Sequence, residues 1–578
     1  FRINSDHQVI KNLLKVGEQV SFVYKKNNGT NVGDLYNNTL RSAFATSPLS
    51  PIYSDNNLYD SPYNDTSSSD WHNSDGNPYG SMMTNTNNEN KAATFAGNVY
   101  AELTPIKNLK IRTVFGATYG SSEYRSYTPL YQFDIYTKNT ENTKVNQNMT
   151  HGLTMVWTNT AQYDWTLGEH SFNALIGMES SRYEGTYVGA RNGILKEGFD
   201  DWDHAFVSNG SATTPEQGLG ADGKPNDETR TVSYFARLGW NWKETYMINA
   251  TVRADGSSKF ASGHRFGYFP SVSAGWVISS ESWFPKDKQI DYLKVRASIG
   301  SLGNERISDA EFPYQAAINF GNSYMYDKGS QSVTAVQNAA QYNYAFNDIT
   351  WETTTTYDIG IDITLLNNRL SLTGDYYYKK TSDMLLTLGF PSYAGFSAPK
   401  QNAGDMYTHG WEFEASWRDQ IGEVSYGVSF NLSDYRSKMG YLGDRRTIDG
   451  NKIYEEDSYY YEWFMYKTDG LFVTDADLYD SEGNKYPTLT ANDKAGNIKY
   501  VDVNGDGVIN ADDKVRLGNS LPEFQFGGNL FLGWKDWDFS LSFQGVGHQN
   551  VLFNSAWIQP LKEQWGAVPS LILGNYWS

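Results

Sequence analysis

The chain has 578 residues, a formal net charge of −19 and no cysteine. The absence of thiols excludes disulfides, cysteine nucleophiles and cysteine-ligated zinc, and the negative charge disfavours nucleic acid as a partner. The mean hydropathy is −0.58, and no run approaches the roughly 18 apolar residues of a transmembrane helix. These values still allow a membrane β-barrel, because barrel strands distribute their apolar residues among polar ones.

Alternation of apolar and polar residues predicts strands from the start of the chain. Weak patterns at Phe1–His7 and Leu14–Tyr24 are followed by a long polar segment, Lys25–Lys91. Clearer strands come next, at Thr94–Thr104, Leu109–Tyr119, Leu153–Trp165 and Ser171–Glu179. Loops are predicted between and after them, at Gly120–Gly152 and Ser180–Arg230.

The segment Thr231–Gly300 shows the repeating unit most clearly, as four strands. One of them places Ile248, Ala250 and Val252 on one face, and another places Leu293, Val295 and Ala297 there. The polar residues of these two strands share the opposite face, namely Asn249, Thr251, Arg253, Lys294, Arg296 and Ser298. Aromatic residues gather at the ends of the apolar faces, as in Tyr234, Trp240, Trp242, Tyr246 and Trp276. This pattern is typical of a transmembrane barrel with lipid outside and water inside, although a soluble β-sandwich also alternates.

The order of connections separates these two folds. Further strands at Thr355–Leu365, Arg369–Tyr378, His409–Arg418, Val424–Ser433, Phe524–Trp534 and Asp536–Val546 bring the total to about 16. From Thr94 onward, short turns alternate with long loops, of which the longest are Ser180–Arg230, Ser301–Thr354 and Asp434–Pro522. An outer-membrane barrel keeps this alternation, with periplasmic turns and extracellular loops. We therefore predict an all-β fold, a large antiparallel transmembrane β-barrel with long extracellular loops.

Several motifs carry a family resemblance. They are Arg253-Ala-Asp-Gly-Ser-Ser-Lys-Phe260, Arg265-Phe-Gly-Tyr-Phe-Pro-Ser-Val-Ser-Ala-Gly-Trp276, Trp351-Glu-Thr-Thr-Thr-Thr-Tyr357, Leu366-Asn-Asn-Arg-Leu370, Asp375-Tyr-Tyr-Tyr-Lys-Lys-Thr381 and Pro522-Glu-Phe-Gln-Phe-Gly527. In this order they resemble the SusC/RagA family of TonB-linked outer-membrane transporters of the Bacteroidetes. The resemblance implies a barrel of about 22 strands with a plugged lumen. Because no plug, TonB box or final strands are found, residues 1–578 are expected to be a partial barrel domain of a longer product.

The resemblance also implies a function and its partners. The protein would be an active importer of oligosaccharides or peptides in the bacterial outer membrane, and not an enzyme. A surface lipoprotein of the SusD type would cover the extracellular mouth, and TonB would act through the plug. Membrane lipid would surround the barrel, and transporter–lipoprotein pairs could dimerise. A passive porin and a soluble surface adhesin or glycan-binding β-protein stay open as alternatives.

Two further patterns do not indicate catalysis. Gly218-Leu-Gly-Ala-Asp-Gly223 matches the dinucleotide-binding motif, but we interpret it as flexible loop because no strand pattern precedes it and no helical pattern follows it. The eight histidines are scattered, and no nucleophile stands beside a base.

An aromatic cluster lies in the longest loop, at Tyr459, Tyr460, Tyr461, Trp463, Phe464 and Tyr466. It could stack on a sugar or a partner, but the core of a folded loop is favoured, since large aromatic residues usually serve packing.

The long insertion Asp434–Pro522 contains a calcium-type loop at 502–513. An EF-hand-type loop supplies oxygen ligands from positions 1, 3, 5, 7, 9 and 12, which here are Asp502, Asn504, Asp506, the carbonyl of Val508, Asn510 and Asp513. Gly507 occupies position 6, where the chain must turn sharply, and Ile509 is the expected apolar anchor. Position 12 is Asp in place of the usual bidentate Glu, with Asp512 as the neighbouring alternative. The spacing predicts a structural Ca²⁺ site, and a solvated acidic turn that binds nothing is the alternative.

Overall fold

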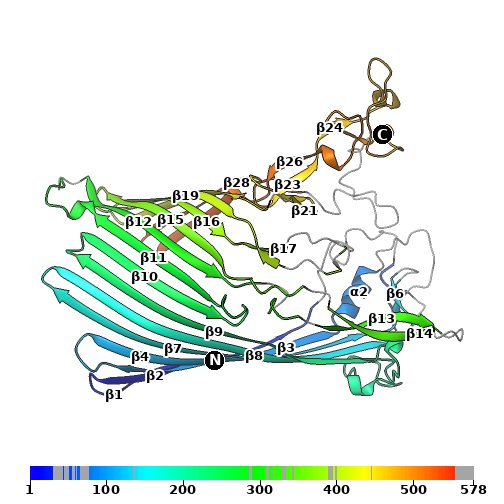
Figure 1. Ribbon diagram of the computed structural model, residues 1–578, viewed down its shortest axis with the longest axis horizontal. Coiled ribbons are helices and arrows are strands. Elements are labelled where there is room, and N and C mark those ends of the chain that lie inside the picture. Colours follow the sequence, from blue (N-terminus) through cyan, green and yellow to red (C-terminus); the bar gives the residue numbers. More distant parts are fainter. Residues whose placement is uncertain are drawn as a thin grey trace.

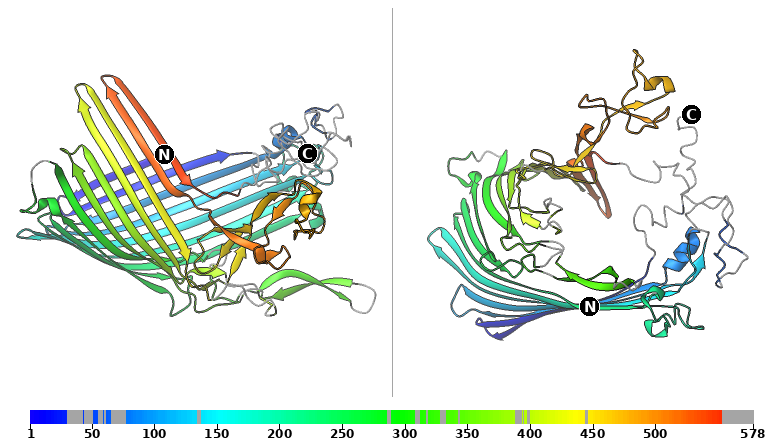
Figure 2. Two further views of the ribbon diagram at one scale, coloured as in Figure 1. Left: turned by 90° about the horizontal axis from the view of Figure 1, so that it is seen from above. Right: turned by 45° about the vertical axis from the view of Figure 1, so that its right-hand side comes forward.

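The computed structural model describes residues 1–29, 43, 51–54, 59, 61–64, 77–133, 137–285, 289–307, 312–316, 318–327, 333–341, 344–387, 393, 395–396, 400–443 and 446–552. Its main feature is a 16-stranded sheet that curves into a trough (Figures 1 and 2). The strands are β1 (Arg2–Ile10), β2 (Leu14–Asn27), β3 (Asn88–Leu103), β4 (Leu109–Thr128), β7 (Lys144–Leu167), β8 (His170–Gly193), β9 (Gly220–Trp242), β10 (Tyr246–Ser257), β11 (Phe266–Val277), β12 (Ile290–Asn304), β15 (Glu352–Leu365), β16 (Leu370–Ser382), β19 (Met406–Ile421), β20 (Val424–Met439), β27 (Glu523–Trp534) and β28 (Trp537–His548).

Each strand of the sheet pairs antiparallel with the next one along the chain. The predicted all-β fold and the predicted strand number of about 16 are both confirmed. Among the described strands, β1 and β28 form the two edges of the sheet. The trough is therefore one continuous meander, which is the connectivity of an up-and-down barrel wall.

The predicted alternation of short and long connections is also confirmed. Short turns lie at one end of the trough, on the left of Figure 1, and we call this the turn end. One such turn has Leu366, Asn367 and Asn368 at positive φ, which asparagine tolerates well. The opposite end, the loop end, carries the small elements of the long connections: α2 (Pro78–Asn85), β5 (Tyr131–Gln132), β6 (Lys138–Asn139), β13 (Asn319–Asp327), β14 (Val333–Ala340), β17 (Leu385–Thr387) and β18 (Lys400–Asn402). None of the described helices is long and apolar enough to cross a membrane.

Several strands are longer than predicted. β8 and β9 stay paired as far as Arg191 and Gly220, so only residues 194–219 connect them, and the prediction of a loop over Ser180–Arg230 is wrong. The loop predicted over Gly120–Gly152 is also wrong at both ends, because β4 and β7 stay paired as far as Thr128 and Lys144. The polar composition of these extensions suggested loops. Beyond the apolar band, however, a strand needs only ladder hydrogen bonds to its neighbours and no apolar face.

The longer β9 also includes most of the Gly218–Gly223 motif. Gly218 lies in a turn with φ 94°, whereas Gly220, Ala221 and Gly223 pair with residues of β8. The interpretation as flexible loop is therefore wrong for most of the motif. The chain continues from the motif as the rest of β9, where a dinucleotide-binding unit needs a helix.

Packed apolar clusters lie at the loop end of the trough. In the largest, Phe260, Phe269, Ile307, Ile349, Trp351 and Leu385 are all buried. The indole N–H of Trp351 donates to the carbonyl of Arg265 over 2.9 Å. Three of the motifs that carry the family resemblance therefore meet in this one cluster. Their shared role is to join the end of β10 and the start of β11 to the start of β15.

Candidate functional site

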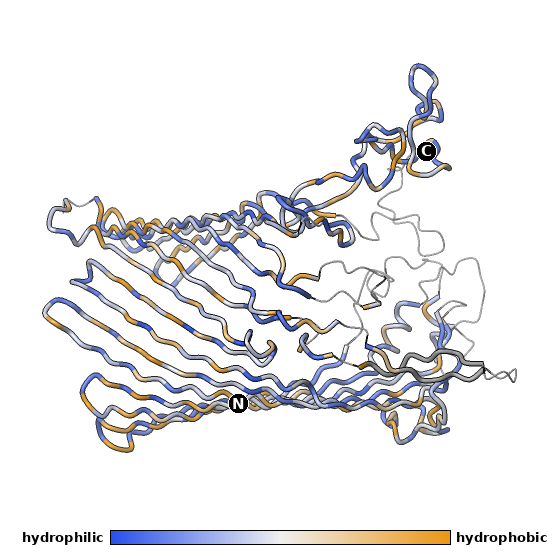
Figure 3. The backbone as a smooth tube through the Cα atoms, in the orientation of Figure 1, coloured by the Kyte–Doolittle hydropathy of each residue, from blue (hydrophilic) through white to orange (hydrophobic). Residues whose placement is uncertain are grey.

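Hydrophobic and hydrophilic residues alternate along strands of the trough (Figure 3), so the two faces of the sheet differ in polarity. On β15 and β16, the convex face carries Ile359, Ile361 and Leu372, and Ile359 is 55% exposed. The opposite, concave face carries Asp358, Asp362 and Thr373. Large apolar side chains that face outward on neighbouring strands need an apolar solvent, which lipid supplies.

Stacked aromatic rings border the apolar band at the turn end. Trp242 and Tyr246 lie 5.5 Å apart, Tyr246 and Trp276 6.1 Å apart, and Trp165 and Phe172 4.9 Å apart, measured between ring centroids. Because these residues belong to successive strands, their rings form a girdle at one height. Such girdles mark the boundary between hydrocarbon and head groups.

A second group of rings borders the band toward the loop end. The ring of Tyr378 lies 6.3 Å from that of Tyr407 and 4.8 Å from that of His409. On β19, Tyr407 and Trp417 at the two borders are ten positions apart, which corresponds to about 33 Å along a strand. At the usual strand tilt this spans about 25 Å vertically, the height of an outer-membrane apolar band.

Ion pairs join neighbouring strands on the concave face. Arg296 of β12 lies 2.7 Å from Asp375, 3.3 Å from Asp362 and 3.9 Å from Asp358. Similarly, Arg253 of β10 contacts Asp255 at 2.7 Å and Glu179 at 3.6 Å, and it donates to Ser233. Both arginines therefore form structural bridges on the concave face.

The connection between β20 and β27 forms a folded lobe of its own. Because β20 continues to Met439 and β27 begins at Glu523, this insertion covers 440–522, which is slightly shorter than the predicted Asp434–Pro522. Its four-stranded sheet consists of β21 (Thr447–Asp449), β22 (Lys452–Tyr454), β23 (Glu462–Tyr466) and β26 (Lys514–Asn519). A hairpin of β24 (Thr468–Leu471) and β25 (Ile498–Tyr500) extends from it, at the upper right of Figure 1.

The aromatic cluster of the insertion is mainly a packing core. Tyr454 and Tyr460 pack edge to face and lie against buried Met384, Met439 and Leu442. Burial raises the pKa of Tyr454 to about 12, so its phenol stays neutral. Phe464 is also buried, at 3% exposure. The interpretation of the cluster as the core of a folded loop is therefore supported.

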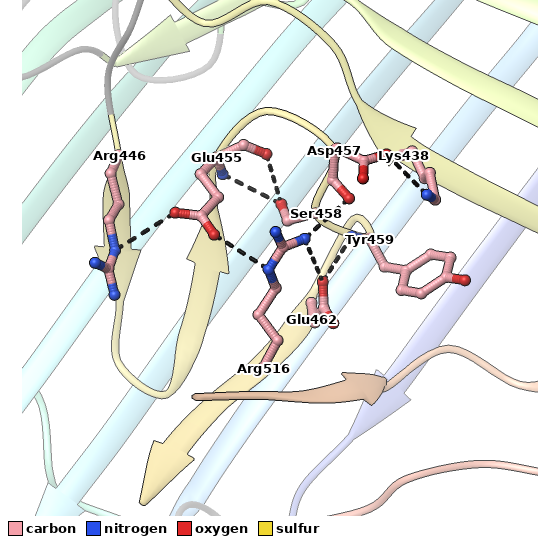
Figure 4. A network of polar contacts seen from close by, with 8 residues as sticks. All are labelled: Lys438, Arg446, Glu455, Asp457, Ser458, Tyr459, Glu462 and Arg516. Carbon is pink, nitrogen blue, oxygen red and sulfur yellow. Dashed lines mark hydrogen bonds and ion pairs between the residues drawn. The ribbon is translucent and has the colours of Figure 1, made fainter. Parts of the chain in front are cut away.

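A network of charges holds the insertion to the trough (Figure 4). Arg516 of β26 lies 3.1 Å from Glu455 and 3.8 Å from buried Glu462, and it donates to the carbonyl of Asp457. Asp457 in turn contacts Lys438 of β20 at 2.8 Å, and this hydrogen bond lowers the pKa of the Asp457 carboxyl. Sequence reasoning did not find this network, because its members are far apart in the chain and no local pattern links them.

The predicted calcium loop lies directly before β26. Gly507 has φ 82°, as its position in the loop requires, and Ile509 is buried at 4% exposure. Each side chain predicted to be a ligand accepts local backbone N–H groups. The side chain of Asp502 accepts from the N–H groups of Gly505 and Gly507. In the same way, Asn504 accepts from the N–H of Asp506, Asp506 from that of Val508, and Asn510 from that of Asp512.

Asp513 closes this loop. It is fully buried and accepts from the N–H groups of Asn510, Val503 and Asn504. These donors, with Asn510 the strongest, hold the pKa of Asp513 below its ordinary value. Asn504 donates its amide to Asp506 over 3.1 Å. Within the described part of the chain, no three carboxylate or imidazole side chains converge on one metal position.

Comparison with known proteins places these features in a family. A family model described as "TonB dependent receptor-like, beta-barrel" matches residues 23–560. TonB-dependent receptor P26 of Formosa agariphila is 29% identical over 571 residues, which cover 96% of this chain and 53% of that protein. TonB-dependent receptor SusC of Bacteroides thetaiotaomicron is 25% identical over 580 residues, which cover 94% of this chain and 53% of that protein. The chain thus spans about half the length of these relatives.

A solved structure shows the same fold. The RagAB peptide transporter superimposes with a TM-score of 0.75 at 21% identity, over 94% of this chain and 57% of that chain. The resemblance to the SusC/RagA group is confirmed by the family model, by the SusC match and by this fold. The chain therefore belongs to the TonB-dependent receptor-like β-barrel family.

Proposed function

We propose that this protein imports oligosaccharides or peptides through the bacterial outer membrane, energised through TonB. The observation that carries the proposal is the family match over most of the chain. The apolar convex face, bordered by two aromatic girdles, supports insertion into a bilayer. The polar concave face suits a wet lumen that a plug occupies. Transport, and not catalysis, is the proposed activity.

A surface lipoprotein of the SusD type is the proposed partner, docked at the loop end. The connections 194–219, 305–351 and 440–522 all emerge there, and the last of them has its own sheet and core. Binding functions concentrate in long loops on rigid scaffolds. By the usual orientation of outer-membrane barrels, this end is extracellular.

Growth and uptake test the importer. A strain lacking the gene is compared with its parent on a panel of oligosaccharides and peptides as sole nutrients, with and without TonB. We expect one class of substrate to require both the gene and TonB. Uptake that needs the gene but persists without TonB would favour the passive porin. Equal growth of both strains on every substrate would contradict an import function.

We also propose that the loop 502–513 binds a structural Ca²⁺. The candidate ligands are oxygens of Asp502, Asn504, Asp506, Val508, Asn510 and Asp513. Hard oxygen donors suit this cation, and the backbone N–H groups that orient the side chains leave lone pairs on each carboxylate. Asp502, Asp506 and Asp513 place three carboxylates in one short loop, and a divalent cation would offset their negative charge. The bound ion would stiffen the loop that leads into β26.

A further inference from the structure

An uncharged cleft of about 560 Å³ opens at the loop end, between β2, α2, β3 and β4. Its lining consists of Asn27, Asn28, Gly29, Thr84, Asn85, Asn87, Asn88, Asn90, Tyr124, Ser126, Tyr127 and Thr128. Half of these residues are asparagines, and none carries a charge. Charged residues make up 20% of the whole chain, so a lining without any is unusual. The cleft differs in this from the concave face around Arg296, where ion pairs join the strands.

One asparagine holds the cleft together. Asn88 donates its amide to the carbonyls of Gly29 and Asn85, and its Oδ1 accepts from the N–H of Gly29 over 3.3 Å. The carbonyl of Asn87 accepts from the N–H of Tyr127 over 2.8 Å. These bonds join the end of β2, the end of α2 and the start of β3. The cleft is therefore preformed, which lowers the entropy cost of binding.

The remaining asparagine side chains are available to a ligand. Within the described part of the chain, no hydrogen bond is made by the side-chain amides of Asn27, Asn28, Asn85, Asn87 or Asn90. Each amide offers two donors and one acceptor oxygen. Asn90 pairs in register with Tyr124, whose ring is 37% exposed on the same face of the sheet. The cleft thus combines several unused amides with one exposed aromatic ring.

We propose that this cleft binds a neutral sugar unit of a glycan. Adjacent sugar hydroxyls donate and accept at once, as amides do, and the apolar face of a sugar ring packs on an aromatic ring. A peptide with charged termini or side chains would find no charged side chain in this lining. The lysines next to Asn27 and Asn90 in sequence, Lys26 and Lys91, are already paired with Glu89 at 2.5 and 2.6 Å. The proposal rests on the proposed importer for its role as an entry subsite at the loop end.

Calorimetric titration of the purified protein in detergent tests this assignment. The probes are malto-, cello-, xylo- and manno-oligosaccharides, added one at a time, with a capped uncharged peptide as comparison. We expect wild type to bind at least one of these oligosaccharides. Asn90→Leu and Tyr124→Leu should each weaken that binding about tenfold or more, because each removes a desolvated contact. Asn27→Leu, at an exposed strand end, provides a variant that leaves the fold undisturbed.

Asn98→Leu is the matched control, since Asn98 lies on the same strand and face as Asn90 but outside the cleft. It should bind like wild type. Unchanged binding in Asn90→Leu, Tyr124→Leu and Asn27→Leu would overturn the proposal, and so would binding of the peptide alone or of no probe. Binding is measured without an energised membrane. Passive uptake in cells, together with intact binding in the calorimeter, would therefore contradict only the TonB-driven importer.

Discussion

Arg516 places its Nε 3.1 Å from Oε1 of Glu455, and this contact connects the strand after the predicted calcium loop to the body of the insertion. The same guanidinium faces Glu462, whose side chain is only 7% exposed. A buried carboxylate that loses its cation keeps the cost of its desolvation. The stability of the whole insertion is therefore expected to depend on this one arginine.

Arg516→Leu should destabilise the insertion by about 1–3 kcal/mol while the trough stays folded. Limited proteolysis within 440–522, followed by mass spectrometry, measures the opening. Lys535→Leu is the control, because Lys535 pairs with Glu423 in an exposed turn and surface pairs contribute little. Equal cleavage rates for Arg516→Leu and wild type would contradict the role assigned to the network.

Removal of calcium should loosen the same lobe. Asp502→Ala combined with Asp506→Ala, or addition of a chelator to wild type, is expected to make 440–522 sensitive to protease while the barrel stays folded. Metal analysis of the wild-type protein should find one Ca²⁺ per chain. If no calcium is found and chelation leaves cleavage unchanged, the loop is a solvated acidic turn.

Acid should act on the insertion through Asp513. Its pKa is lowered in the folded state, chiefly by the N–H of Asn510, so ionised Asp513 stabilises the fold above the ordinary carboxyl pKa of about 3.9. This contribution is lost as pH falls below that value toward the lowered pKa. Proteolysis in a chelator should therefore accelerate below about pH 4. Asp513→Asn should show a weaker pH dependence, and an equally steep profile would exclude this carboxyl as the cause.

Charge on the convex face should be costly, and a matched change on the concave face should not be. Ile361→Arg and Leu372→Arg are each expected to destabilise the protein by about 2–4 kcal/mol in lipid. Thr373→Arg is the control, since Thr373 neighbours Leu372 in sequence but faces the trough beside Asp362. Folding into lipid vesicles across a urea series measures the difference. Equal penalties on both faces would contradict the assigned membrane face.

Deletions at the loop end should separate partner docking from barrel assembly. Replacing 194–219, which connects β8 to β9, by a short Gly-Ser turn leaves the β8–β9 ladder intact and should weaken co-purification of the lipoprotein. Similar replacements in 305–351 and 440–522 extend the test, and shortening of the 278–289 connection at the turn end is the control. Unchanged co-purification after all three loop-end deletions would show that docking does not use these connections.

The sequence alone determined the sheet and its faces. A period of two along each strand requires alternate side chains to face opposite sides, so the positions of Ile361 and Asp362 in the chain suffice to assign them to opposite faces. The alternation of short and long connections likewise indicated two different ends. The calcium-type spacing was equally readable, because an EF-hand-type loop takes its ligands from one short segment. These inferences depend only on neighbours in the chain.

Tertiary structure alone decided the features that depend on distant residues. The extent of β8 and β9 results from ladder pairing with each other, which polar composition does not reveal. Arg516 meets Glu455 only because the insertion folds back on itself, and Asn27 meets Asn90 only because β2 pairs with β3 across a long connection. Local pattern specifies which face a side chain takes, whereas long-range pairing specifies which side chains it meets.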